Sequence, residues 1–170
     1  MNNLNKVAKF EKVSFEQYKK DYKLNNDVDT IYNDLLLPKR ATKYSAGYDF
    51  FLPYDINLKP GETALIPSGI RVKIDYNWVL KCYPRSSLGF KYRLQLDNTV
   101  GIIDADYYNS LNEGHIFVKF TNHSNQDVCL TKGSAFMQGI FIQYGITIDD
   151  DATDERIGGI GSTNKKWLNN

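Results

Sequence analysis

The chain has 170 residues, with 21 Lys and Arg against 20 Asp and Glu, and 42% of its residues are hydrophobic. Its length fits one domain with a tail or an insertion, and its hydrophobic content supports a packed core and excludes global disorder. A formal net charge of +1 argues against a nucleic-acid coat or a membrane-surface protein, so any affinity for phosphate must come from a local cluster.

Residues 1–40 form a segment that we interpret as an accessory to the domain that follows. The N-terminus has no apolar signal core, and no part of the chain approaches the roughly 18 apolar residues of a membrane span, so we expect a cytoplasmic protein. A first strand is expected within residues 4–13. Ser14 and Gln17 have the spacing of a capping box, in which Ser14 begins a short helix that continues to about Tyr22.

Residues 41–148 have the pattern of a β domain. Short apolar runs alternate with Gly, Pro, Asn and Asp about every ten residues, and the run from Ile70 to Ile74 alternates with the period of a half-buried strand. Many short strands at regular spacing predict an all-β fold, a distorted jelly roll or barrel. Two cysteines, Cys82 and Cys129, lie in strand-like apolar runs and are expected to be buried, reduced thiols.

Residues 149–170 form a polar tail. An acidic run comes first, and Arg156 and a Gly-rich run from Gly158 to Thr163 follow it. Chain ends of this kind are often frayed. The Gly-Gly-x-Gly-Ser-Thr sequence also offers backbone N–H groups and two hydroxyls, as phosphate-binding loops do. We therefore expect a mobile tail that contributes to a phosphate site.

The residues suited to chemistry are concentrated in residues 84–109. Arg85, Ser86 and Ser87 offer charge-assisted and hydroxyl hydrogen bonds that suit phosphate oxygens. Asp104 follows an apolar run, where a carboxylate is costly unless it has a partner or a catalytic role; a turn residue between two strands is the alternative interpretation. An anion-binding cluster and a candidate general base so close in sequence suggest a site that binds a phosphorylated ligand and attacks it.

Five segments of the chain, in order, match one pattern. The most specific are the second motif, Pro84-Arg85-Ser86-Ser87 with Gly89, which permits a turn, and the third motif, Asn98-x-x-Gly-x-Ile-Asp-x-Asp-Tyr. The others are the first motif, Ala46-Gly47-Tyr48-Asp49, the fourth, Gly133 through Gln138, and the fifth, Gly158 through Thr163. Over about residues 41–164 the chain thereby resembles the trimeric dUTPase family. The resemblance implies a homotrimer of jelly-roll-like subunits that hydrolyses dUTP to dUMP and pyrophosphate with Mg²⁺.

By this resemblance, Asp104 orients and deprotonates the water that attacks the α-phosphorus, which requires a carboxylate within hydrogen-bond reach of that water. Tyr107 packs on the deoxyribose and leaves no room for a ribose 2′-hydroxyl. Asn98 begins a tight β-hairpin, and its amide, with the backbone at Gly101 and Ile103, binds the uracil edge and leaves cytosine with mismatched polar groups. The alternative interpretations are an ordinary strand aromatic for Tyr107 and an ordinary turn residue for Asn98.

The resemblance places the phosphates near the second, first and fourth motifs. Arg85, Ser86 and Ser87 contact them and stabilise the leaving pyrophosphate, and a buried structural arginine is the alternative for Arg85. Asp49 lies near the Mg²⁺–triphosphate and acts through water, so we expect no direct protein ligand to the metal. Gln138 helps to hold the region of the catalytic water.

The chain departs from the family pattern in the fourth and fifth motifs. Ala135 stands where the family often has an Arg, so the ion pair of that Arg is replaced or absent. Ile160 replaces a common aromatic residue and would cover the base by apolar contact. Arg156, one residue closer to the Gly pair than usual, is expected to reach the γ-phosphate as the tail closes over a neighbouring subunit's site. The remaining phosphate contacts expected from the tail are Gly161, Ser162 and Thr163.

Two other functions remain open. A dCTP deaminase shares the fold, but the matched segment offers no carboxylate to shuttle protons at the base. A regulatory binding protein, switched by nucleotide, would use residues 1–40 and the insertion at residues 109–114 to dock a partner protein. His115 and His123, the only histidines, lie in polar turns and are expected to be solvated.

Overall fold

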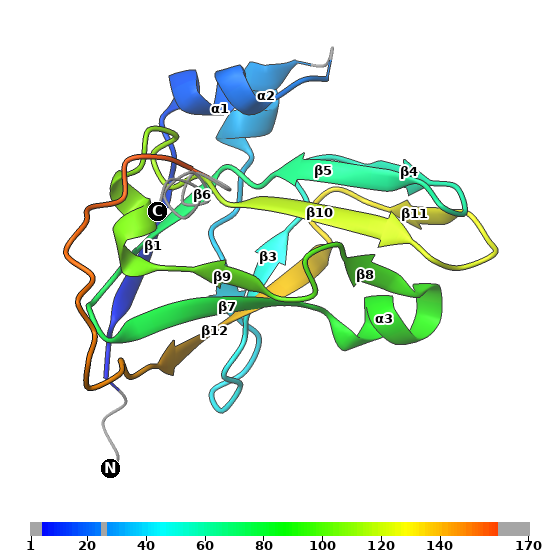
Figure 1. Cartoon of the computed structure of the whole chain (residues 1–170). Helices are drawn as coiled ribbons and strands as arrows, with labels where there is room; N and C mark the ends of the chain where they lie inside the picture. The colour runs from blue at the N-terminus through cyan, green and yellow to red at the C-terminus, as the bar shows by residue number, and fades with distance from the viewer. Residues whose placement is uncertain (1–4, 25–26, 160–170) are drawn as a thin grey trace, which may run out of the picture.

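The computed structural model describes residues 5–24 and 27–159, and it confirms a mostly β chain with few helices (Figure 1). The strands are β1 (Ala8–Lys12), β2 (Lys39–Arg40), β3 (Tyr48–Phe51), β4 (Ile56–Leu58), β5 (Thr63–Pro67), β6 (Ile70–Ile74), β7 (Trp78–Pro84), β8 (Leu94–Leu96), β9 (Gly101–Ile103), β10 (Phe117–Asn122), β11 (Val128–Leu130) and β12 (Ala135–Gln143). The helices are α1 (Phe15–Asp21), α2 (Val28–Asn33), α3 (Ser86–Tyr92) and the 3₁₀ helix η1 (Ala105–Asn109).

The strands form two main sheets and two ribbons. One sheet has the order β2-β3-β12-β7-β9 and the other β5-β10-β8, while β1 pairs with β6 and β4 with β11. All these pairings are antiparallel. Figure 1 shows β5 and β10 above β7 and β9. Because each strand turns one side toward the opposite layer, the main apolar core lies between the layers.

The alternation predicted for residues 70–74 is confirmed by β6. Ile70, Val72 and Ile74 are buried, whereas Arg71 and Lys73 between them are not. Successive side chains of a strand point to opposite faces, so a period of two places every second side chain in the core. The same geometry allows short strands elsewhere in the chain to bury apolar residues on one side only.

The N-terminal segment adds a small helical layer with an apolar cluster of its own. Ser14 is the N-cap of α1, as predicted, and its side chain accepts a hydrogen bond from the Gln17 N–H at 3.1 Å. The reciprocal half of the capping box is absent, because the Gln17 amide donates to Asp21 instead. Helix α2 was not predicted; Asp27 ends the polar run and caps that helix.

Two local predictions around the second and third motifs are wrong. Gly89 does not form a turn but lies inside helix α3, which ends at Arg93 in the left-handed conformation with φ 50°. Residues 98–103 do not form a hairpin, because β8 pairs with β10 whereas β9 pairs with β7. The segment from Asn98 therefore carries the chain from one sheet to the other.

The cysteine prediction is half correct. Cys82 is buried in β7, and burial raises the pKa of its thiol to about 12, whereas Cys129 is exposed. Both are free thiols. Within the described residues, none of the helices combines the length and apolar character needed to span a membrane.

Candidate functional site

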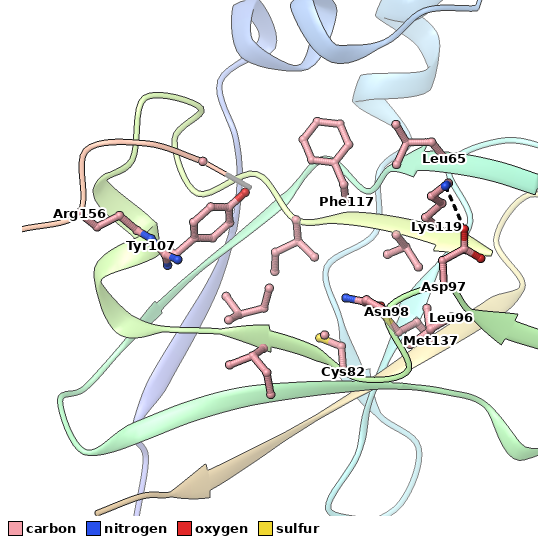
Figure 2. A pocket seen from close by; sticks show the side chains of 16 residues that line it. Leu65, Cys82, Leu96, Asp97, Asn98, Tyr107, Phe117, Lys119, Met137 and Arg156 are labelled. Carbon is pink, nitrogen blue, oxygen red and sulfur yellow. Dashed lines mark ion pairs between the residues drawn. The ribbon is translucent and has the colours of Figure 1, made fainter. Parts of the chain in front are cut away.

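A cavity of about 470 Å³ opens between the two main sheets, and it collects several predicted site residues. Asn98, Gly101, Ile103, Tyr107 and Arg156 all line it. Figure 2 shows Tyr107 and Arg156 at one end and Asn98 nearer the other, with its amide pointing inward. Residues of the third motif and two residues of the tail, Arg156 and Gly159, thus meet at a single concave surface.

Sequence reasoning missed the far rim of this cavity. Asp97 and Lys119 face each other there, with Lys119 Nζ 3.0 Å from Asp97 Oδ2 (Figure 2). Phe117 and Cys82 also contribute to the lining. Asp97 precedes the third motif and could have been suspected for that reason. Lys119 and Phe117 come from β10 and enter the site only through strand pairing, which no local pattern reveals.

Tyr107 is held rigidly although it lines the cavity. Its side chain is buried in η1, and its hydroxyl donates to the His115 carbonyl at 2.8 Å and accepts from Asn112 Nδ2 at 2.8 Å. Burial raises the pKa of the Tyr107 hydroxyl, and the hydrogen bond from Asn112 acts against this rise. The guanidinium carbon of Arg156 lies 5.4 Å from the Tyr107 ring centre. The ring is therefore a fixed neutral wall.

Asp104 is placed where its carboxylate can interact with solvent and with the tail. It is the N-cap of η1, yet its side chain makes no capping hydrogen bond, so capping does not account for it. Arg156 Nη1 lies 3.3 Å from Asp104 Oδ2 and 3.2 Å from Asp106 Oδ1. The two carboxylates are 49% and 53% exposed, so these ion pairs contribute little stability.

A second cluster joins the first, second and fourth motifs. Gln138 of β12 pairs with Asp49 of β3 on one side and with Tyr83 of β7 on the other. Arg85 follows β7, and its Nη1 lies 3.3 Å from Asp49 Oδ2. Packing is tight at this point, since a Cβ at Gly47 would lie 2.7 Å from Gln138 Oε1.

The two serines of the second motif open helix α3. Ser86 and Ser87 are its first residues, and both are exposed. Their hydroxyls are therefore accessible from solvent beside Arg85, which is the N-cap residue of the helix. Exposed hydroxyls next to a guanidinium remain suited to an anion, although the local structure is a helix and not the expected turn.

The second cluster does not line the cavity of the same chain. In the β7–β9 pairing, Cys82 faces Gly101 and Leu80 faces Ile103. Arg85 lies beyond one end of this pairing and Asp104 beyond the other, which separates them by about six residues of extended chain, on the order of 20 Å. One chain therefore carries two groups of site residues that do not meet.

His115 contradicts the prediction of a solvated histidine, whereas His123 is exposed as expected. The His115 side chain is fully buried; its Nε2 accepts from the Gly69 N–H at 2.8 Å, and its Nδ1 lies 2.6 Å from Asp21 Oδ2. Accepting from Gly69 requires an unprotonated Nε2, so the imidazole is neutral and Nδ1–H donates to Asp21. Burial lowers the pKa of His115, and the bond to Asp21 opposes this only in part.

The tail predictions are tested only in part. Ile160, Gly161, Ser162 and Thr163 lie outside the described residues. Upstream of them, the Leu111 N–H donates to the Ile157 carbonyl at 3.2 Å. The tail up to residue 159 thus runs along the insertion after η1 and lines the cavity of its own chain, whereas the resemblance implied a neighbouring subunit's site.

Three comparisons place the chain among known proteins. The model of the dUTPase family matches residues 33–164. The deoxyuridine 5′-triphosphate nucleotidohydrolase of Lactococcus lactis is 42% identical over 130 residues, which cover 75% of this chain and 87% of that protein. The crystal structure of dUTPase from Streptococcus mutans is 35% identical and superposes with a TM-score of 0.65, covering 81% of this chain and 97% of that one.

More distant structures share the fold alone. The dUTPase from phage phi11 of Staphylococcus aureus is 18% identical, with a TM-score of 0.63 over 87% of this chain and 97% of that chain. A mutant of the same phage enzyme, also 18% identical, was described with the coordination of a structural Mg(II) ion. The similarity in fold therefore extends well beyond the similarity in sequence.

Proposed function

The chain belongs to the dUTPase family, and on that premise we propose that it hydrolyses dUTP to dUMP and pyrophosphate. The cavity between the sheets carries this proposal, because it brings together the uracil and sugar candidates of the third motif and one phosphate candidate, Arg156. We also place the reaction in the cytoplasm, and two unpaired cysteines support that location.

Uracil is proposed to bind against the edge of β9. This strand is the last of its sheet, so one side of its backbone has no strand partner in the described part of the chain. An edge strand presents N–H and C=O groups in a fixed order, as required to complement the polar edge of uracil. The Asn98 amide points into the same space and would add a further hydrogen bond (Figure 2). Cytosine would leave buried groups unpaired and be rejected.

The deoxyribose is proposed to lie on Tyr107. Its ring is fixed at the hydroxyl by two hydrogen bonds and cannot retreat without breaking them. A ribose 2′-hydroxyl would need the space that the ring occupies. The wall would therefore reject UTP by lack of room.

The phosphates are proposed to bind Arg85, Ser86 and Ser87 of a second subunit. Within one chain these residues lie on the order of 20 Å from Asp104, too far for one triphosphate to bridge the base and this cluster. A homotrimer in which neighbouring subunits share each site resolves the separation. Asp49 and Gln138, which adjoin Arg85, would enter the site with it.

Asp104 is proposed to activate the attacking water for an in-line displacement at the α-phosphorus. Its carboxylate is half-exposed, so water can reach it, and Arg156 restrains one of its oxygens. The Nε of Arg156 is buried and has no acceptor among the described residues. A γ-phosphate oxygen would supply one once the guanidinium turns from its carboxylate partners toward bound dUTP.

Mg²⁺ fits this arrangement as an ion held mainly by the substrate. Residues 5–24 and 27–159 contain no group of three or more His, Cys, Asp or Glu that could cage a metal. Asp49, whose carboxylate is paired with Arg85, could still accept hydrogen bonds from water on an ion bound to the triphosphate. When bound, the ion would neutralise phosphate charge.

Pyrophosphate release from dUTP, UTP, dTTP and dCTP tests the proposal, and ammonia release is measured alongside to detect a deaminase. We expect turnover of dUTP only. Asp104→Asn should abolish turnover but retain the binding of a non-hydrolysable dUTP analogue. Asp106→Asn is a matched control, because Asp106 pairs with the same guanidinium atom and is similarly exposed. Equal activity of the two variants would remove Asp104 from its role.

A further inference from the structure

The N-terminal helix α1 touches both ends of a short loop that holds Tyr107 in place. At the start of α1, the Ser14 N–H and Oγ donate to the Glu113 carboxylate at 2.7 and 2.6 Å. At its end, Asp21 accepts from His115 at 2.6 Å. Residues 113–115 are thus clamped by one seven-residue helix. His115 of this loop supplies the carbonyl that accepts from the Tyr107 hydroxyl, and Asn112, just before the loop, supplies the amide that donates to it.

We propose that α1 positions Tyr107 through His115 and so sets how strictly the site excludes a 2′-hydroxyl. Asp21 and His115 are positioning residues in this inference, because they act through Tyr107 and do not touch the cavity. The inference rests on the proposed function, in which Tyr107 contacts the sugar. It assigns a purpose to part of residues 1–40, which precede the motifs.

His115 is fixed by every polar group that it carries. Its ring bonds to Asp21 on one side and to the Gly69 N–H on the other. The backbone N–H of His115 donates to the Asn112 carbonyl at 3.0 Å. Its carbonyl is then the acceptor for the Tyr107 hydroxyl. Removing Asp21 would leave a buried donor unpaired and remove the tie between His115 and α1, so the loop that carries this carbonyl would be held less firmly.

The loop also presses directly on the backbone that carries Tyr107. Glu113 and Gly114 both have positive φ, 57° and 70°, which turns the chain sharply at this point. A Cβ at Gly114 would lie 2.8 Å from the Tyr107 carbonyl oxygen and from Tyr108 Cα. A displacement of the loop is therefore transmitted to η1, because no space separates them.

Loss of the Asp21–His115 bond should affect the selectivity for dUTP over UTP more than the turnover of dUTP. Exclusion of a 2′-hydroxyl depends on a ring that cannot recede, and a looser anchor would admit UTP without removing the catalytic groups. We expect Asp21→Ala to lower the ratio of kcat/KM for dUTP to that for UTP by about five- to tenfold, the effect of one lost buried hydrogen bond. The kcat for dUTP should change less than this ratio, because Asp21 bonds to Gln17 and His115 and contacts neither Asp104 nor the phosphate-binding residues.

Two variants distinguish positioning from a general loss of stability. Asp21→Asn keeps an acceptor for the His115 Nδ1–H and should restore the wild-type ratio. Asp27→Ala removes the N-cap of α2 in the same helical layer without touching His115, and should also leave the ratio unchanged. Tyr107→Phe should lower the ratio as Asp21→Ala does, and the double variant should lower it no further, because both act through one hydroxyl.

Different results of these assays would overturn the dUTPase activity and the positioning role of α1. A wild-type protein that releases no pyrophosphate from dUTP would overturn the proposed function itself. A wild-type protein that rejects UTP, together with a folded Asp21→Ala variant of unchanged ratio, would overturn only the positioning role. Additive effects in the double variant would do the same. Should Asp21→Ala not fold, Glu113→Ala cuts the clamp at the other end of α1, and the same outcomes apply to it.

Discussion

Lowering the pH from about 7.5 to about 5.5 should destabilise the folded protein through His115. Burial lowers the pKa of His115 below its ordinary value of 6.5, while Asp21 and Glu113, the acidic groups near it, oppose the shift only in part. The unfolded chain therefore binds a proton more readily than the folded chain just below pH 6.5. Stability from this group is fully present above that pH and is lost as the pH falls toward the lower pKa of the folded state.

The size of this pH effect on the free energy of unfolding depends on one proton and on the surroundings of His115 Nε2. A single group changes the free energy of unfolding by at most about 1.4 kcal/mol per pH unit. The Gly69 N–H points at Nε2, so a proton there would place two donors face to face in addition to burying a charge. Glu113, whose pKa is lowered from 4.5, loses its contribution only as the pH approaches that value. The window around pH 6 therefore isolates His115.

Urea unfolding at fixed protein concentration measures this directly, since concentration matters for an oligomer. The wild type should lose stability between the two pH values. His123→Ala, at an exposed site, should lose a similar amount, whereas His115→Leu should be less stable but nearly independent of pH in this window. A wild type whose stability is flat or rises on acidification would refute the neutral, buried imidazole.

Two further predictions concern packing and the tail. Gly139→Ala should destabilise the protein by about 1–3 kcal/mol in urea unfolding, because its Cβ would lie 2.7 Å from Leu80 Cδ1; unchanged stability would contradict the tight contact. Arg156→Ala should change stability by less than about 1 kcal/mol, because its partners are half-exposed, yet raise the KM for dUTP. A wild-type KM would count against a phosphate contact from Arg156, and Arg156→Lys is the matched control for charge.

Two local signals in the sequence predicted local structure correctly. The Ser14 cap and the alternation in β6 depend on residues a few positions apart, and both are confirmed. His115 was misread because its ring partners are Gly69 and Asp21, the latter 94 positions away in sequence. A polar turn around a histidine says nothing about which distant carboxylate will cover it. Burial of this kind arises from packing and not from neighbouring residues.

Helix α3 shows how tertiary packing outweighs propensity. A glycine within seven residues disfavours a helix, and Gly89 had been expected, as part of the second motif, to permit a turn. The segment nevertheless buries Leu88 in the main core, and Arg93 ends the helix in the left-handed conformation. Burial of one large apolar side chain contributes about 1.5–3 kcal/mol, which exceeds the roughly 1 kcal/mol cost of a helical glycine.

The order of the five motifs in sequence does not reveal how strand pairing sorts them into two groups. Strand β12 joins Asp49, Arg85 and Gln138, while the cavity collects the third motif and Arg156. If subunits share sites, Arg85→Ala and Asp104→Asn should each be inactive alone but complement each other when refolded together. When the two variants are mixed in equal amounts, the chain that supplies Arg85 and the chain that supplies Asp104 are each intact at about half of the sites. Both residues are then intact at about one quarter of the sites, so about a quarter of wild-type turnover should return. A site built within one chain would give no recovery, because every chain in the mixture would carry one defect.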